Sequence, residues 1–206
     1  MNPISHTRGR AGINFSRHAT LAVILMFIST PLAAASFNCN KASTKVEKMI
    51  CADADLSEAD EQLAEAYRNL RKVLPKSERA LLKRDQRQWL KDRNVEFRTC
   101  EDPYCYAFYL VRIEQLSPVA QASFKCKKAR TKPEKKICGS RLLRHADGRM
   151  AYAYKTYFFS PHEQREWLKS RNRKLRRSNC DTECAWQVYK DRIEELYRHL
   201  LRRALY

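Results

Sequence analysis

The sequence contains few of the residues that form turns between β-strands, with only four Gly and seven Pro among 206 residues. No segment alternates apolar and polar residues with a period of two, and no Asn-Gly or Asp-Gly turn lies between apolar runs. Strands and hairpins carry those signals, so their absence argues against a β-sheet. The composition is also not that of a low-complexity tail. We therefore expect an all-α fold.

Long hydrophobic runs are also missing, apart from one apolar stretch over residues 21–28. It is shorter than the roughly 20 residues that a membrane-spanning helix needs. Basic residues without any acidic one precede it, and Ala33-Ala34-Ala35 follows as a small-residue cleavage site. The sequence predicts a signal peptide over residues 1–35 that is cleaved rather than retained as an anchor. We expect no transmembrane segment in the mature chain.

Cysteine, by contrast, is plentiful and even in number: eight Cys, all beyond residue 35. In an exported chain this predicts a disulfide framework, so we expect a periplasmic or secreted bacterial protein. Zinc is the less favoured alternative, because there is no Cys-x-x-Cys and no His partner in the first four-Cys group. A catalytic Cys is less favoured still. We expect no cofactor and no metal.

The mature chain contains an internal repeat. Residues 36–51 recur as 123–138 with an offset of 87, and residues 86–94 recur as 164–172 with an offset of 78. The second copy is therefore nine residues shorter between its two long helices. In both copies the Cys, an Asp early in the first long helix and a Gln-x-x-Trp-Leu-x-x-Arg motif are retained.

The repeat predicts two tandem disulfide-stapled helical modules, over residues 36–118 (the first half) and 119–206 (the second half). Each is expected to have a short N-terminal helix followed by a three-helix antiparallel bundle. The short helix begins after a Thr-x-x-Glu capping box, Thr44 with Glu47 in the first half. The first long helix is expected to begin at Ser57.

Disulfides are expected within each module, with the pairing left open. The interpretation favours bonds from the N-terminal segment to the turn before the last helix, because a bond within that turn would restrain little. The cysteines concerned are Cys39, Cys51, Cys100, Cys105, Cys126, Cys138, Cys180 and Cys184.

Two ion pairs are predicted from the antiparallel arrangement. Asp60 lies near the start of the first long helix, close to the level at which Arg93 comes late in the next, antiparallel helix, and Asp147 and Arg171 repeat this relation. We interpret them as partly buried pairs that fix helix register, with a role in partner binding as the alternative. Trp89 is expected in the core.

Charge distinguishes the two copies. The first half has 15 Lys and Arg against 14 Asp and Glu, whereas the second has 23 against 9. Such an excess of basic residues commonly forms a surface that keeps the protein soluble. The more specific hypothesis is attraction to an anionic partner such as lipopolysaccharide, membrane lipid or an acidic protein. Nucleic acid is not expected, because export argues against it and no recognised motif accompanies the charge. The candidate patch comprises Lys125, Lys127, Lys128, Arg130, Lys132, Arg173, Lys174, Arg176 and Arg177.

These motifs resemble the LprI-like lysozyme inhibitor family, in two tandem copies. The resemblance rests on a Phe-x-Cys start, Thr-x-x-Glu-x-x-Ile-Cys, Gln-x-x-Trp-Leu-x-x-Arg, two further Cys and a late Arg-Ile, and it covers nearly all of the mature chain. In the first half the matching residues are Phe37, Cys39, Thr44, Glu47, Ile50, Cys51, Leu56, Asp60, Tyr67, Gln86, Trp89, Leu90, Arg93, Cys100, Cys105, Arg112 and Ile113.

The resemblance implies an exported binding protein, with lysozyme as the expected partner, that acts by surface contact and is not an enzyme. Because many lysozymes are cationic, the near-neutral first half is the expected inhibitory part. The alternative is an envelope-associating protein whose basic second half binds an anionic component. An enzyme acting on the cell wall is least favoured, since no paired carboxylates or Ser/His set recurs in both copies.

Overall fold

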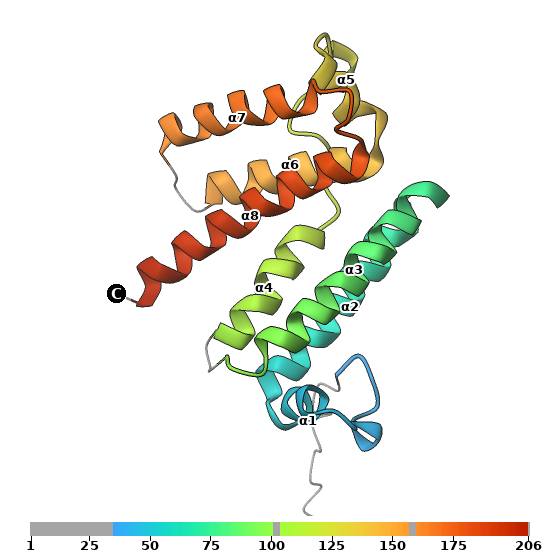
Figure 1. The fold of residues 1–206 in the computed structure, drawn as a ribbon, viewed down its shortest axis with the longest axis vertical. Coiled ribbons are helices and arrows are strands. Elements are labelled where there is room, and N and C mark those ends of the chain that lie inside the picture. Colours follow the sequence, from blue (N-terminus) through green and yellow to red (C-terminus); the bar gives the residue numbers. More distant parts are fainter. Residues whose placement is uncertain (1–34, 101–103, 157–159, 206) are drawn as a thin grey trace, which may run out of the picture. The chain divides into compact units, whose positions relative to one another are not determined.

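The computed structural model describes residues 35–100, 104–156 and 160–205, and the predicted signal peptide lies outside them apart from Ala35. These residues belong to one compact unit (Figure 1). They form helices only, which confirms the all-α expectation for this part of the chain. None of these helices is both long and apolar enough to cross a bilayer. In chain order the elements are η1 (Cys39–Lys41), α1 (Lys45–Ala52), α2 (Ala54–Val73), α3 (Lys76–Glu96), α4 (Tyr104–Leu116), η2 (Cys126–Lys128), α5 (Lys132–Gly139), α6 (Arg141–Thr156), α7 (Pro161–Leu175) and α8 (Thr182–Leu205).

Each half opens with a short hook, a 3₁₀ turn followed by a short capped helix. In the first half Thr44 Oγ1 accepts a hydrogen bond from Glu47 N at 3.1 Å, and Glu47 Oε2 accepts one from Thr44 N at 2.9 Å. The same capping box joins Thr131 and Glu134 at the start of α5. Both predicted capping boxes are therefore confirmed. Backbone amides of Thr44 and Ser43, which donate to the carboxylate, lower the pKa of Glu47 to about 2.

The first long helix begins earlier than the sequence suggested. The N-cap of α2 is Asp53, four residues before Ser57, because Asp53 Oδ1 accepts a hydrogen bond from Leu56 N at 2.9 Å. Ser57 is buried one turn into the helix, where its hydroxyl donates to Ile50 O of α1 at 2.9 Å. The predicted start at Ser57 is thus wrong, and the hydroxyl instead joins the hook to α2.

The disulfides are local. Cys39 pairs with Cys51 and Cys126 with Cys138, each within a hook, whereas Cys100–Cys105 and Cys180–Cys184 close the turns before α4 and α8. Each bond stays within its half, but the favoured bonds from hook to turn are wrong. The physical reason is that the 3₁₀ turn folds back along α1, which leaves the two hook cysteines with Cα atoms 5.7 Å apart in the first half.

The two halves share one hydrophobic core. Buried residues of α2 and α4 and buried residues of α6 and α8 belong to a single cluster, and α4 packs against both α6 and α8. Buried Arg149 of α6 donates to Glu114 O of α4 at 3.0 Å and pairs with the Glu114 carboxylate. The arrangement as two tandem modules therefore remains a prediction.

The segment between the halves lies against α6. Ala120 N donates to His145 Nδ1 at 3.1 Å, and His145 Nε2 lies 2.9 Å from Gln115 O. The ring is therefore neutral with its proton on Nε2, and burial lowers the pKa of His145 to about 4. Gly148 allows the close approach, because a Cβ there would lie 2.1 Å from Gln121 O.

Candidate functional site

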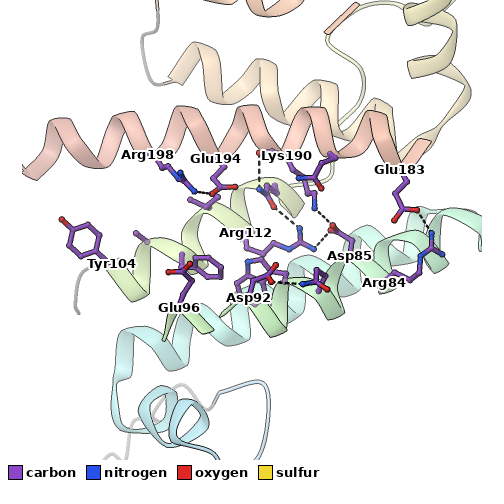
Figure 2. A pocket seen from close by; sticks show the side chains of 17 residues that line it. Arg84, Asp85, Asp92, Glu96, Tyr104, Arg112, Glu183, Lys190, Glu194 and Arg198 are labelled. Carbon is purple, nitrogen blue, oxygen red and sulfur yellow. Dashed lines mark hydrogen bonds and ion pairs between the residues drawn. The ribbon is translucent and has the colours of Figure 1, made fainter. Parts of the chain in front are cut away.

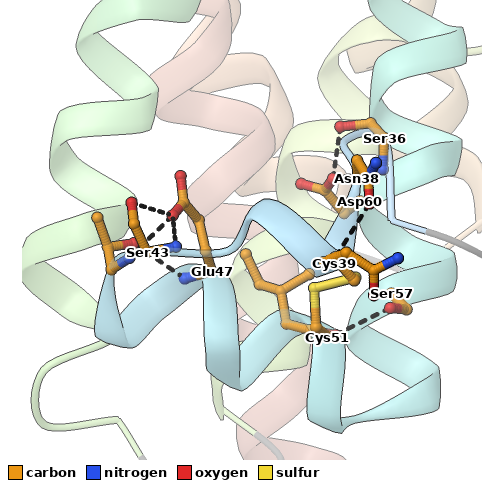
Figure 3. Close-up of a disulfide and its surroundings, with 11 residues drawn as sticks. Ser36, Asn38, Cys39, Ser43, Glu47, Cys51, Ser57 and Asp60 are labelled. Atoms are coloured by element: carbon orange, nitrogen blue, oxygen red, sulfur yellow. Dashed lines mark hydrogen bonds between the residues drawn. A yellow bond between two sulfur atoms is a disulfide. The ribbon is translucent and has the colours of Figure 1, made fainter.

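The predicted Asp60–Arg93 pair lies inside the first half, where it belongs to a larger network. Arg93 Nη1 is 3.4 Å from Asp60 Oδ1, and Tyr109 Oη donates to the same oxygen at 2.7 Å. The other carboxylate oxygen accepts hydrogen bonds from Ser36 N at 2.9 Å and Ser36 Oγ at 2.5 Å (Figure 3). One carboxylate thus ties the segment that precedes η1 to α2, α3 and α4.

The second half repeats this network. Asp147 Oδ1 lies 2.9 Å from Arg171 Nη1 and accepts from Tyr189 Oη at 2.8 Å, while Asp147 Oδ2 accepts from Ser123 N at 2.8 Å. Burial raises the pKa of the Tyr189 hydroxyl, with the Asp147 charge acting in the same direction, so it stays a donor. Sequence reasoning missed the serine and the tyrosine, although each recurs at an equivalent position in both copies.

Both networks are too buried to meet a partner. Asp60 and Arg93 are 5% and 8% exposed, and Asp147 is fully buried. Every oxygen of the two carboxylates already accepts hydrogen bonds. That these groups hold helices in register remains a prediction, and a binding surface has to be sought elsewhere.

A groove with a volume of about 820 Å³ lies between α3 and α4 of the first half and α8 of the second. We call it the α3–α4–α8 groove. Figure 2 shows α8 along one side and α3 with α4 along the other, with charged side chains reaching in from both. Both aromatic and ionised side chains line it.

A buried charge cluster closes the middle of the groove. Arg112 is 1% exposed, and its Nη2 lies 2.7 Å from Asp85 Oδ2, whereas Lys190 of α8 pairs with the other carboxylate oxygen. Burial alone would raise the pKa of Asp85, but the charges of Arg112 and Lys190 outweigh it and lower the pKa. Gln86 Oε1 accepts two further bonds from Arg112, at 2.8 and 3.0 Å. The cluster is satisfied internally and joins the two halves.

Beyond this cluster the groove presents two carboxylates without a cationic partner among the described residues. Asp92 accepts a hydrogen bond only from the Gln88 amide, at 2.8 Å, and Glu96 lies one turn further along α3. The other groove carboxylates are paired, Glu183 with Arg84 and Glu194 with Arg198.

Aromatic side chains accompany these free carboxylates. The rings of Trp89 and Phe108 stack with centroids 5.4 Å apart, and both are half-buried. Tyr104 at the start of α4 is 56% exposed. Trp89 was expected in the core. It packs against the core but is only half-buried, and it also lines the groove.

A smaller groove, with a volume of about 240 Å³, lies between α7 and α8 of the second half. Trp167 and Arg192 occupy the positions of Trp89 and Arg112 in the repeat. Lys174, however, stands where the first half has Glu96, and Ser170 where it has Asp92. The tryptophan and arginine positions thus recur in the second groove, while the two carboxylates do not.

The structure brings the two basic segments of the candidate patch to neighbouring elements. One segment lies on η2 and the start of α5, the other at the end of α7, and α5 packs against α7. All nine side chains of the patch are exposed, and none forms an ion pair with another described residue. In the described ranges there is also no group of His, Cys, Asp and Glu that could hold a metal ion.

Comparison with known proteins found no match among curated proteins and none among solved structures. A family model does match, over residues 38–125. This segment contains the first hook and helices α1 to α4, and therefore the side of the groove that carries Asp92 and Glu96. The match covers one copy of the repeat, so the second copy of the family remains a prediction. Over residues 38–125 the chain is similar to the family of the lysozyme inhibitor LprI.

Proposed function

We propose that this protein is an exported lysozyme inhibitor that acts by surface contact and has no catalytic activity of its own. The family match over residues 38–125 carries this proposal. The disulfides support export, because such bonds persist in oxidising compartments.

The charge distribution supports a role for the first half in binding. That half is almost neutral in total, and its groove-facing side has carboxylates to offer a cationic enzyme. The second half, with 23 Lys and Arg against 9 Asp and Glu, would repel such an enzyme at long range. Contact through the α3–α4–α8 groove side would therefore be favoured over contact through the basic patch.

The test is a cell-wall lysis assay with the mature protein purified from the periplasm or medium, so that the disulfides form. We expect lysis by lysozyme to fall with increasing protein and to be restored by salt, because surface charges are screened within about 10 Å at 0.1 M. The same protein after reduction and alkylation is the control. Full lysozyme activity at saturating protein would refute the inhibitor function.

A second candidate function is docking on the anionic headgroups of an envelope lipid through the basic patch. The supporting observation is that nine exposed cations without an ion-pair partner among the described residues lie on η2, the start of α5 and the end of α7, and that α5 packs against α7. Each cation near an anionic surface contributes about 1 kcal/mol, so a cluster of this size would support salt-sensitive association.

Vesicle sedimentation tests this second function. Vesicles with phosphatidylglycerol should bind the protein, whereas phosphatidylcholine vesicles should not, and replacing Lys127, Lys128, Arg176 and Arg177 by Gln should weaken binding. The matched control replaces four exposed cations of the first half, Lys45, Lys48, Arg71 and Lys72, by Gln. Equal losses in both variants would contradict a role for the patch.

A further inference from the structure

We infer that the α3–α4–α8 groove receives an arginine or lysine side chain of the partner protein, held by Asp92 and Glu96. This assigns a binding site to the proposed function, and it names lysozyme as the partner only through that proposal. The unbalanced charge of the groove, its aromatic floor and the altered copy in the second half all support this site.

The charges of the groove do not balance. Four of its cations are used internally: Arg84, Arg112, Lys190 and Arg198 each pair with a carboxylate of the groove. Those pairs occupy three carboxylates, since Asp85 serves both Arg112 and Lys190. Five carboxylates line the groove, so Asp92 and Glu96 remain for an incoming cation.

The spacing of Asp92 and Glu96 favours the binding of one cationic side chain over a long-range attraction spread across the surface. Asp92 and Glu96 are four residues apart on α3, so they lie on one helix face about one turn apart. A guanidinium presents several N–H donors in a fixed plane and can bond to two carboxylates at once. Both carboxylates line the same groove, and neither is tied to a cation that would have to be displaced.

The floor of the groove suits the stem of such a side chain. Phe108 and Val111 of α4 are half-buried and face the groove, and Tyr104 is exposed beside them. Arg and Lys bury their methylene stems on apolar surface while the charged head remains polar. The chain itself provides a related contact, because the Arg93 guanidinium lies 5.9 Å from the Trp89 ring centroid.

The repeat supplies a natural comparison. The second groove keeps Trp167 but has Lys174 in place of Glu96 and Asp191 in place of Val111. A cation approaching from the α7 side would meet a lysine there. The scaffold therefore tolerates a lysine at this position, which makes Glu96→Lys a substitution that reverses the charge without an obvious cost in folding.

The experiment measures binding of lysozyme to the full mature protein and to Glu96→Lys and Asp92→Asn/Glu96→Gln variants. The matched control is Glu58→Gln/Glu65→Gln, which removes the same charge from the exposed face of α2. We expect both groove variants to bind at least about tenfold more weakly and the control to bind like the wild type. Thermal unfolding of each variant verifies that folding is unchanged.

A second probe separates this inference from the proposed function. A short peptide of alternating arginine and glycine is titrated into the same proteins, and the indole N–H resonance of Trp89 reports occupancy of the groove. If the wild type binds the peptide and Glu96→Lys does not, the site is supported even when no lysozyme is inhibited. If lysozyme is inhibited equally by wild type and Glu96→Lys, or if the wild type leaves the Trp89 resonance unmoved by the peptide, the inference is wrong.

Discussion

Gly148 on α6 offers a direct test of how the two halves are joined. An Ala at a helical Gly normally stabilises a helix by up to about 1 kcal/mol. Here the added Cβ would lie 2.1 Å from Gln121 O and 2.8 Å from the Ala120 Cβ, and the first of these is a backbone atom that no rotamer change can move. We therefore expect Gly148→Ala to displace the segment between the halves.

The magnitude follows from the contacts around that segment. Relief of an overpacked contact costs about 1–3 kcal/mol. The hydrogen bonds on either side, Ala120 N to His145 and Ser123 N to Asp147, are worth about 1 kcal/mol each if they are lost. If both hydrogen bonds are lost, subtraction of the propensity gain leaves a net loss of about 2–4 kcal/mol, or a Tm lower by about 4–16 °C for a chain of this size.

Gly139 provides the matched control, because a Cβ there would meet nothing within 4 Å. Gly139→Ala at the end of α5 should leave the Tm unchanged or raise it by up to about 4 °C. Differential scanning calorimetry of both variants is the assay. If Gly148→Ala stabilises the protein as much as Gly139→Ala does, then the segment does not lie against α6 and the described junction is wrong.

Three further predictions concern buried groups and cross-links. Burial lowers the pKa of His145 to about 4, so below about pH 6.5 the unfolded chain binds more protons than the folded protein and stability falls as the pH falls. Urea unfolding of the wild type should therefore show a loss of about 2 kcal/mol between pH 7.5 and 5, and His145→Gln should lack this loss. The opposing effect of Glu114, whose pKa burial raises, is common to both proteins. Asp147→Ala leaves a buried guanidinium unpaired and should cost about 3–5 kcal/mol in urea unfolding, against about 1 kcal/mol for Tyr189→Phe; similar losses would contradict the assigned network. Peptide mapping without reduction should recover both hooks as single cross-linked peptides, and a fragment that joins a hook to the turn before the last helix would exclude the observed pairing.

Features set by neighbouring residues could be predicted from the sequence. The capping box of Thr44 and Glu47 is one example, because its donors and acceptors lie within one helical turn. The relation of Asp60 to Arg93 is another, since two antiparallel helices joined by a short turn leave few choices of register. The internal repeat strengthened both, because each arrangement occurs twice.

The disulfide pairing and the groove could not be predicted in the same way. Spacing alone did not show that the 3₁₀ turn returns Cys39 to Cys51. The groove depends on α8 packing against α4, and of its joining residues Asp85 is matched in the second copy by Glu163, whereas Lys190 is matched in the first copy by the apolar Leu110. Contacts between the halves are specific to this pair of copies, so a comparison of the copies cannot reveal them.

The Ser36–Asp60 hydrogen bond has a consequence for maturation. If signal peptidase cuts after Ala35, as the sequence predicts, the Ser36 amide that lies 2.9 Å from Asp60 Oδ2 becomes the α-ammonium of the new N-terminus. Cleavage during export would then place a positive charge beside the Asp60 carboxylate, which is 5% exposed. The corresponding Ser123 of the second copy lies within the chain, so its amide never becomes charged. Acetylation of the mature N-terminus should therefore lower the Tm, and an acetylated protein as stable as the free one would show that processing leaves the first bundle unchanged.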